Sequence, residues 1–289
     1  MSRADRPSNS RVVRLADWAV YPALLWTAGL FAVPLGIMLA VSLWRRVGGK
    51  LQADWTLANY IKFFDRSFFL EALGNSIEVT LIVTVISVLL AYPLAYILAY
   101  RIPKRWQKIA LIMAILPFWT SYVVRSYSWL LILSNNGVVN WVLLNLGIVA
   151  EPLEMGYTRG ATVLGFVHFF TMLLTLTIYA NLVQISPSYR LAAADLGASA
   201  IQVFLRITLP LSLPGVAVGA FITFVIAIGD YITPQILGGG KEILIPQGIM
   251  LQIVRSANFP MAAAMSMILM AVVSLTYLLF ARYLKMERV

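Results

Sequence analysis

The chain has 289 residues, of which 61% are hydrophobic and 12% are charged, and its mean hydropathy of +0.84 excludes an ordinary water-soluble domain. Its formal net charge is +10, but the Lys and Arg residues lie mainly at the ends of apolar runs, which argues against nucleic-acid binding. Cysteine is absent, which excludes disulfides, thiolate metal sites and cysteine nucleophiles.

The first part of the chain combines a basic tail with a long apolar run. Residues 1–17 contain several Arg residues together with Ser, Asn and Pro, and we expect a cytoplasmic N-terminal tail. The apolar run 18–44 is too long for the core of a secretory signal and lacks a small-residue cleavage pattern behind it, so we expect an uncleaved first span.

Six segments of the sequence are long and apolar enough to cross a bilayer. About twenty apolar residues suffice, because a helix rises about 1.5 Å per residue and the hydrocarbon layer is roughly 30 Å thick. The six segments are 18–44, 76–100, 109–133, 161–184, 207–236 and 259–281. The sequence therefore predicts an all-α membrane protein with six transmembrane helices, in which residues 18–289 form one transmembrane domain.

Two segments outside these spans also have apolar patterns. Residues 45–75 are polar but contain Trp55, Tyr60 and Phe63, which indicates a short helix on the outer membrane surface. This helix is either a docking surface for a soluble partner or a plain anchor of the first hairpin. Residues 138–149 are too few to span, and we expect them to form an interfacial or re-entrant helix.

The distribution of basic residues predicts the orientation of the six spans. With the N-terminus inside, the inner side holds Arg3, Arg6, Arg11, Arg14, Arg101, Lys104, Arg105, Lys108, Arg190, Arg206, Arg282, Lys285 and Arg288. The outer side holds Arg45, Arg46, Lys50, Lys62, Arg66, Arg159, Lys241 and Arg255. The excess on the inner side favours a multi-pass protein with both termini in the cytoplasm.

The loop between the fourth and fifth spans, residues 185–210, has a helix-turn-helix pattern on the expected cytoplasmic side. Residues 189–196 are rich in alanine, Gly197 permits a turn, and residues 201–209 again favour a helix before Pro210 opens the next span. Such a loop can protrude as a rigid knob.

This loop resembles the signature of binding-protein-dependent permeases, in which Glu-Ala-Ala is followed by Gly and then by Ile-x-Leu-Pro at fixed spacing. Ala192, Ala193, Gly197, Ile207, Leu209 and Pro210 match this pattern. Leu191 stands where the family has glutamate, and Asp195 is a partial substitute for the missing carboxylate. The resemblance implies a coupling helix that docks on an ATPase through Leu191, Ala192, Ala193, Asp195, Gly197 and Ala198.

The resemblance extends over most of the chain and is closest to the spermidine/putrescine branch of these permeases, on the motifs at 115–133, 135–143 and 229–240. It implies the type I ABC importer permease fold, a location in the bacterial inner membrane, and transport of polyamines or a similar small organic solute. It further implies a second permease subunit, two ATP-binding subunits, and a periplasmic or extracellular solute-binding protein. An ion-coupled secondary carrier and an ABC permease for a different solute class are the alternatives.

The sequence contains no phosphate-binding or catalytic motif of the GxxxxGK[ST], GxSxG or HExxH type. We therefore expect a subunit without a catalytic site and without a cofactor of its own. ATP and Mg would be bound by the partner ATPase subunits.

Ionisable residues at bilayer depth are costly, so each is a candidate for a pathway or a pairing role. Asp230 either attracts a cationic solute, pairs with Arg125, or caps broken helix backbone near Pro234. Arg125 is more plausible as a member of a structural ion pair, and Glu78 is a pathway carboxylate or a solvated residue near the interface. His168, the single histidine, makes no metal site by itself and suits a buried hydrogen bond.

Aromatic residues accompany Arg125 in the third span. Trp119, Tyr122 and Tyr127 present ring faces that attract cations, although helix packing and interfacial belts are the plainer explanation. The expected solute path thus comprises Asp230, Glu78, Trp119, Tyr122, Arg125 and Tyr127, and no metal site is expected.

Overall fold

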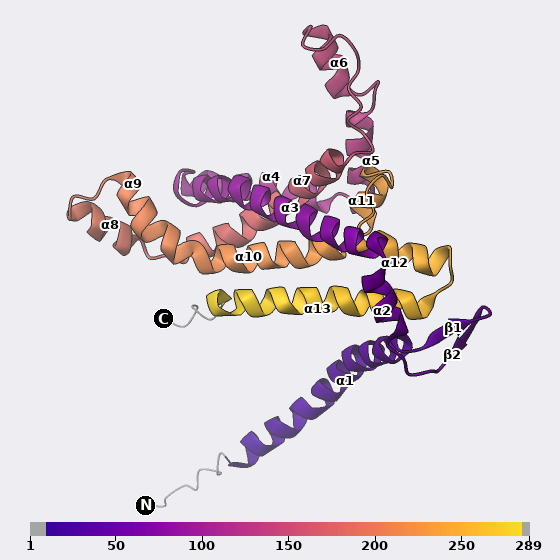
Figure 1. Cartoon of the computed structure of the whole chain (residues 1–289). Helices are drawn as coiled ribbons and strands as arrows, with labels where there is room; N and C mark the ends of the chain where they lie inside the picture. The colour runs from indigo at the N-terminus through magenta and orange to yellow at the C-terminus, as the bar shows by residue number, and fades with distance from the viewer. Residues whose placement is uncertain (1–9, 285–289) are drawn as a thin grey trace, which may run out of the picture.

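The computed structural model describes residues 10–284, which are mostly helical (Figure 1). The long helices are α1 (Ser10–Ser42), α3 (Ser67–Tyr100), α7 (Arg159–Leu182), α10 (Leu209–Gly229) and α13 (Phe259–Leu284). The shorter helices are α2 (Ala58–Asp65), α4 (Lys104–Ile115), α5 (Tyr122–Leu133), α6 (Val138–Asn145), α8 (Pro187–Asp195), α9 (Ala200–Val203), α11 (Ile232–Leu237) and α12 (Ile245–Val254). A 3₁₀ turn, η1 (Leu116–Trp119), and a π-helical turn, η2 (Phe204–Thr208), complete the helical elements.

Five of the six predicted spans are single apolar helices in the described residues. The first helix begins at Ser10, inside the segment expected to be a tail, and residues 1–9 of that tail lie outside the described part of the chain. The all-α membrane architecture predicted from the sequence is confirmed.

The third span is divided in two rather than continuous over 109–133. Its two parts, residues 104–119 and 122–145, meet at an angle of 87°. Pro117 lies at the start of η1, where it lacks an N–H and its ring opposes continuation of the α-helix. Thr120 and Ser121 are extended, and α5 begins only after them.

Helices α3, α7 and α10 pack against one another and form the centre of the molecule. Their shared core contains Val79, Val83, Phe166, Phe170 and Ala227. Glycines bring α10 close to α7, because a Cβ added at Gly215 would lie 2.5 Å from Asn181 and one at Gly219 would lie 2.8 Å from Leu174. Small residues at such contacts are typical of helix packing in membranes.

The segment between the first two spans contains a β-hairpin that the sequence did not indicate. Strands β1 (Arg45–Val47) and β2 (Lys50–Gln52) pair antiparallel. Gly48 and Gly49, with φ of 58° and 82°, form the turn, a conformation that glycine adopts without strain.

The predicted short helix of this segment is confirmed as α2, but it is partly buried. Asn59 donates hydrogen bonds of 2.8 Å to the carbonyls of both Ser42 and Trp44, which fixes α2 to the end of α1. Phe63 is fully buried and its ring stacks on Phe69. The second span accordingly begins at Ser67 rather than at 76.

The short elements gather at two opposite ends of the long helices (Figure 1). Helices α8 and α9 lie at one end, and the β-hairpin lies at the other, where α6 also projects away from the bundle. The start of α1 and the end of α13 point toward the α8–α9 end. Residues 138–149 therefore do not add a seventh crossing. This agrees with the interfacial or re-entrant helix that the sequence predicted.

This arrangement predicts the outcome of a labelling experiment, because the chain has no native cysteine. Single cysteines introduced by Ser199→Cys and Asn145→Cys should react with an impermeant maleimide from opposite sides of the membrane. Reaction of both from the same side would contradict the arrangement, and the unsubstituted chain measures background labelling.

Candidate functional site

The fifth span ends abruptly at Asp230, near the end of the bundle that carries α11 and α12. Helix α10 stops at Gly229, and Asp230 is extended with φ −78° and ψ 125°. Its Oδ1 accepts a hydrogen bond of 2.8 Å from the N–H of Ile232, the first residue of α11. The sequence-based expectation of irregular backbone at this point is confirmed. Tyr231 is the N-cap residue of α11 and makes no side-chain cap bond, and the Asp230 carboxylate just before it satisfies the first free N–H of the helix. In this sense Asp230 caps the broken backbone, which is one of the alternatives that the sequence left open.

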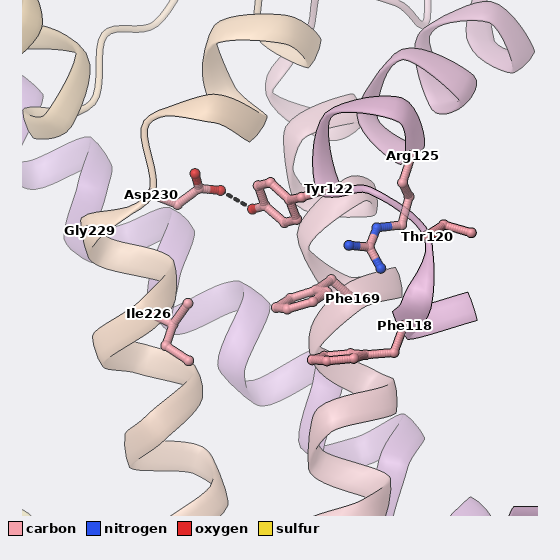
Figure 2. Close-up of a pocket in the computed structure, with 8 residues that line it drawn as sticks. All are labelled: Phe118, Thr120, Tyr122, Arg125, Phe169, Ile226, Gly229 and Asp230. Atoms are coloured by element: carbon pink, nitrogen blue, oxygen red, sulfur yellow. Dashed lines mark hydrogen bonds between the residues drawn. The ribbon is translucent and has the colours of Figure 1, made fainter. Parts of the chain in front are cut away.

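The first turn of α5 lies directly against this break. The Tyr122 hydroxyl donates a hydrogen bond to Asp230 Oδ2 and accepts one from Thr233 Oγ1 of α11. Figure 2 shows the Tyr122 side chain between Asp230 and Arg125. The break in the third span and the break in the fifth span therefore meet at one tyrosine.

Arg125 is 8% exposed, and it has no carboxylate within ion-pair distance among the described residues. Its Nη1 donates to the carbonyl of Pro117 at 3.4 Å. Its Cζ lies 4.7 Å from the ring centre of Phe169 and 5.4 Å from that of Tyr122. Both arrangements are favourable cation–π contacts.

The prediction of a structural ion pair for Arg125 is therefore wrong for the described chain. The oxygens of Asp230 are engaged by Tyr122 and by the N–H of Ile232, and the Tyr122 ring stands between the two charged groups. Arg125 instead holds the carbonyl of Pro117, which joins α5 to the turn that precedes it.

These side chains line an open cavity of about 460 Å³ (Figure 2). Its lining consists of Phe118, Thr120, Tyr122, Arg125, Phe169, Ile226, Gly229 and Asp230. The carboxylate and the aromatic faces suit a protonated amine. The carbonyl end of α10 adds negative potential at the same wall.

Three residues expected on the solute path lie elsewhere. Trp119 is 86% exposed and Tyr127 is 53% exposed, and neither lines this cavity. Glu78 forms an ion pair of 2.7 Å with Arg159, which also lies 3.5 Å from Glu242. This group joins α3, the start of α7 and the loop before α12, so Glu78 has a structural partner away from Asp230.

His168 makes a hydrogen bond as the sequence suggested, because its Nδ1 accepts from the Trp129 indole N–H at 3.0 Å, but the side chain is half-buried rather than buried. No group of three or more potential ligands gathers to form a metal site within residues 10–284.

Sequence reasoning missed the apolar part of the cavity. Phe169 lies at its centre, with its ring stacked on Phe118 at 5.2 Å and edge-on to Tyr122 at 5.4 Å. Ile226 completes the wall from α10. These residues stand within uniformly apolar spans, where no pattern distinguishes a cavity wall from a lipid-facing position.

The loop between the fourth and fifth spans is the second candidate site. Helix α8 ends at Asp195, and Gly197 has φ of +82°, a conformation that favours glycine. Ser199 and Gln202 form a reciprocal capping box that starts α9. The helix-turn-helix geometry predicted from the sequence is confirmed.

The tip of this loop presents apolar side chains to its surroundings. Leu191 is 64%, Leu196 is 89% and Ile201 is 71% exposed. The other predicted docking residues are Ala192, Ala193, Asp195, Gly197 and Ala198, of which Ala193 and Ala198 are half-buried and the rest exposed. An exposed apolar knob of this kind suits a protein partner.

Aromatic contacts hold the loop against the bundle. The Arg190 guanidinium lies 4.0 Å from the ring centre of Tyr100, whose hydroxyl donates to the carbonyl of Leu182 at 2.8 Å. Phe204 packs edge-on against Tyr92 and Tyr96. These contacts join the loop to α3, and the π-helical turn that holds Phe204 continues directly into α10.

Comparison with protein families matches residues 91–286 to the family described as binding-protein-dependent transport system inner membrane component. Among curated proteins, the chain is 33% identical over 228 residues to a spermidine/putrescine transport system permease protein, PotB, of Salmonella typhimurium, a match that covers 79% of both chains.

Two solved structures share the fold of the chain. One is a bacterial ABC transporter involved in the import of the acidic polysaccharide alginate, with a TM-score of 0.75, 18% identity, and coverage of 98% of this chain and 100% of that chain. The other is a bacterial alginate ABC transporter in complex with a pentasaccharide-bound periplasmic protein, with a TM-score of 0.73, 18% identity, and coverage of 92% and 93%.

The hydrogen bonds of the cavity predict different energetic couplings for two pairs of residues. In double-mutant cycles for unfolding in detergent, Tyr122→Phe and Asp230→Asn should couple by about 0.5–3 kcal/mol, because the two side chains are bonded directly. Arg125→Gln and Asp230→Asn should couple less. A stronger coupling in the second cycle would indicate an ion pair and contradict the geometry.

Proposed function

The chain belongs to the family of binding-protein-dependent transport system inner membrane components, and we propose that it forms one half of the path of a small organic solute bearing a protonated amine. It is a multi-pass permease subunit of a binding-protein-dependent ABC importer of the type I fold. The observation that carries the solute class is the Asp230 carboxylate in an aromatic cavity.

Polyamines such as spermidine and putrescine are the solutes proposed first. The name of the relative PotB refers to these two solutes. Their ammonium groups match the Asp230 carboxylate and the ring faces of Tyr122 and Phe169. A permease for another solute class is the remaining alternative, and the buried Arg125 favours it, because an unneutralised guanidinium repels a cation. An ion-coupled carrier is set aside by the family membership.

A second permease subunit of the same fold completes the proposed path. The cavity is open, and the residues of this chain line one wall of it. A facing subunit would supply the opposite wall. A periplasmic or extracellular solute-binding protein would deliver the solute at the end that carries the β-hairpin and α6. The alginate transporter bound to its periplasmic protein is an assembly of that kind, and membrane lipid would cover the exposed α1.

The assembly would contain two ATP-binding subunits. One of them would dock on this chain at the opposite end, on α8 and the turn that follows it. The exposed Leu191, Leu196 and Ile201 form an apolar surface that fits a groove in such a partner. ATP and Mg would be bound by those subunits. This assignment places the α8–α9 end and both termini of the chain in the cytoplasm.

The proposed transport cycle is a shift between two states of the assembly. Closure of the ATP-binding subunits moves the docked loops, and the permease pair changes the side on which its cavity opens. The chain contributes no bond-breaking chemistry to this cycle. Its residues bind the solute, exclude lipid and transmit movement.

Uptake by the reconstituted transporter tests the solute class. With its partner permease, ATPases and binding protein in proteoliposomes, the wild-type complex should accumulate radiolabelled putrescine or spermidine when ATP is supplied. An acidic sugar or an amino-free solute serves as the control. Uptake of the control instead of the amines would contradict the proposed solute.

A glycine substitution tests the docking loop. Gly197→Val should lower the solute-stimulated ATPase activity about tenfold, because valine is strained at φ of +82°. Gly147→Val is the matched control, since Gly147 also has a positive φ of 67° and open surroundings but lies after α6. Full coupled ATPase activity in the Gly197 variant would count against docking at this loop.

A further inference from the structure

We propose that the Tyr122 hydroxyl is a solute-displaceable latch, which holds the two broken spans together until an ammonium group of the solute takes its place on Asp230. The proposal rests on the proposed function, since it concerns the same cavity. It assigns Tyr122 a positioning and gating role in addition to its ring face.

The bonding of Asp230 leaves one oxygen available for exchange. Oδ1 accepts the backbone N–H of Ile232 and is needed to cap α11. Oδ2 accepts the hydroxyl of Tyr122, which is the single side-chain donor to this carboxylate in the part of the chain that the structure describes. A solute that binds Oδ2 can therefore replace Tyr122 without disturbing the helix cap.

An ammonium group is the natural competitor of this hydroxyl. It carries three donors and a full positive charge, so on the Asp230 carboxylate it adds a charge–charge attraction that the neutral hydroxyl lacks. The Tyr122 hydroxyl stands in the position that such a donor would occupy, at the wall of the cavity (Figure 2). Solute binding and the latch thus exclude one another.

Release of Tyr122 would free the first turn of α5. Through its hydroxyl this residue is bonded both to Asp230 and to Thr233, so it ties α5 to the two sides of the break between α10 and α11. The extended residues Thr120 and Ser121 precede α5 at the 87° bend. They can serve as the hinge about which α5 turns.

The latch is connected to the docking loop by one continuous helix. The helical segment Ala200–Gly229 has 30 residues, which corresponds to about 45 Å, and Asp230 follows its last residue. Its first residues adjoin the turn at Gly197 and Ser199. Because binding couplings are reciprocal, solute that releases the latch would alter docking, and the state of the ATPases would alter the latch.

The test uses the complete reconstituted transporter with the Tyr122→Phe variant, which keeps the ring and removes the hydroxyl. Basal ATPase activity without solute should rise, and the KM for the transported amine should fall, each by about 10- to 100-fold as expected for the loss of one hydrogen bond to a charged carboxylate. A merely structural role would lower activity without improving the KM.

Three further variants keep the test decisive. Tyr231→Phe removes a hydroxyl at the same break that does not bond Asp230, and it should behave as wild type. Thr233→Val removes the second bond of the Tyr122 hydroxyl and should shift both quantities in the same direction by less, whereas Thr233→Ser should not. If Tyr122→Phe fails to assemble, the Thr233 pair decides.

Wild-type values of both quantities in Tyr122→Phe, or in Thr233→Val where the first variant does not assemble, would overturn the latch. The proposed function would stand in that case, provided that the wild-type complex accumulates the amine. Failure of the wild-type complex to transport any amine would overturn the proposed function and the latch with it.

Discussion

Backbone N–H and C=O groups at bilayer depth find no water, so each break in a membrane helix needs partners from within the protein. The break after Gly229 meets this requirement through Asp230, which caps α11 and accepts the hydroxyl of Tyr122. The break after Trp119 meets it through Arg125, which donates to Pro117. Both solutions lie within one turn of α5. The position of α5, and with it the cavity, depends on these few bonds.

This constraint also accounts for the polar character of the cavity. A carboxylate and a guanidinium cost free energy in an apolar medium. Asp230 and Arg125 do not pair with each other here. Asp230 accepts bonds from the N–H of Ile232 and the hydroxyl of Tyr122, and Arg125 donates to the carbonyl of Pro117. Arg125 gains ring faces from Phe169 and Tyr122 as well. A solute that enters the cavity therefore meets a negative wall at Asp230 and a shielded positive group behind Tyr122.

The two ends of the molecule are connected by rigid elements. The segment from Ala200 to Gly229 runs from the docking loop to the cavity, and glycines at 215 and 219 let it pack closely on α7. Phe204, in the π-helical turn at its start, is held between tyrosines of α3. This segment, which includes the π-helical turn, thus joins the loop between the fourth and fifth spans to the wall of the cavity.

Local sequence patterns were enough to predict the membrane class, the number of apolar segments and the local geometry of the docking loop. These properties follow from runs of hydrophobic residues, from Pro and Gly placement and from capping residues, all of which act over short distances. Asp230 was identified for the same reason, since a lone charge in an apolar run stands out.

What these charges contact depends on the tertiary structure. Asp230 and Tyr122 are separated by more than a hundred residues, and their bond depends on the 87° bend that directs α5 toward α11 and the end of α10. The same bend leaves Trp119 and Tyr127 exposed, although their residue types matched the expected path. Glu78 forms an ion pair with Arg159, and Phe169 lines the cavity. Side chains alike in type differ in role here because packing between distant helices, which no local pattern records, sets their neighbours.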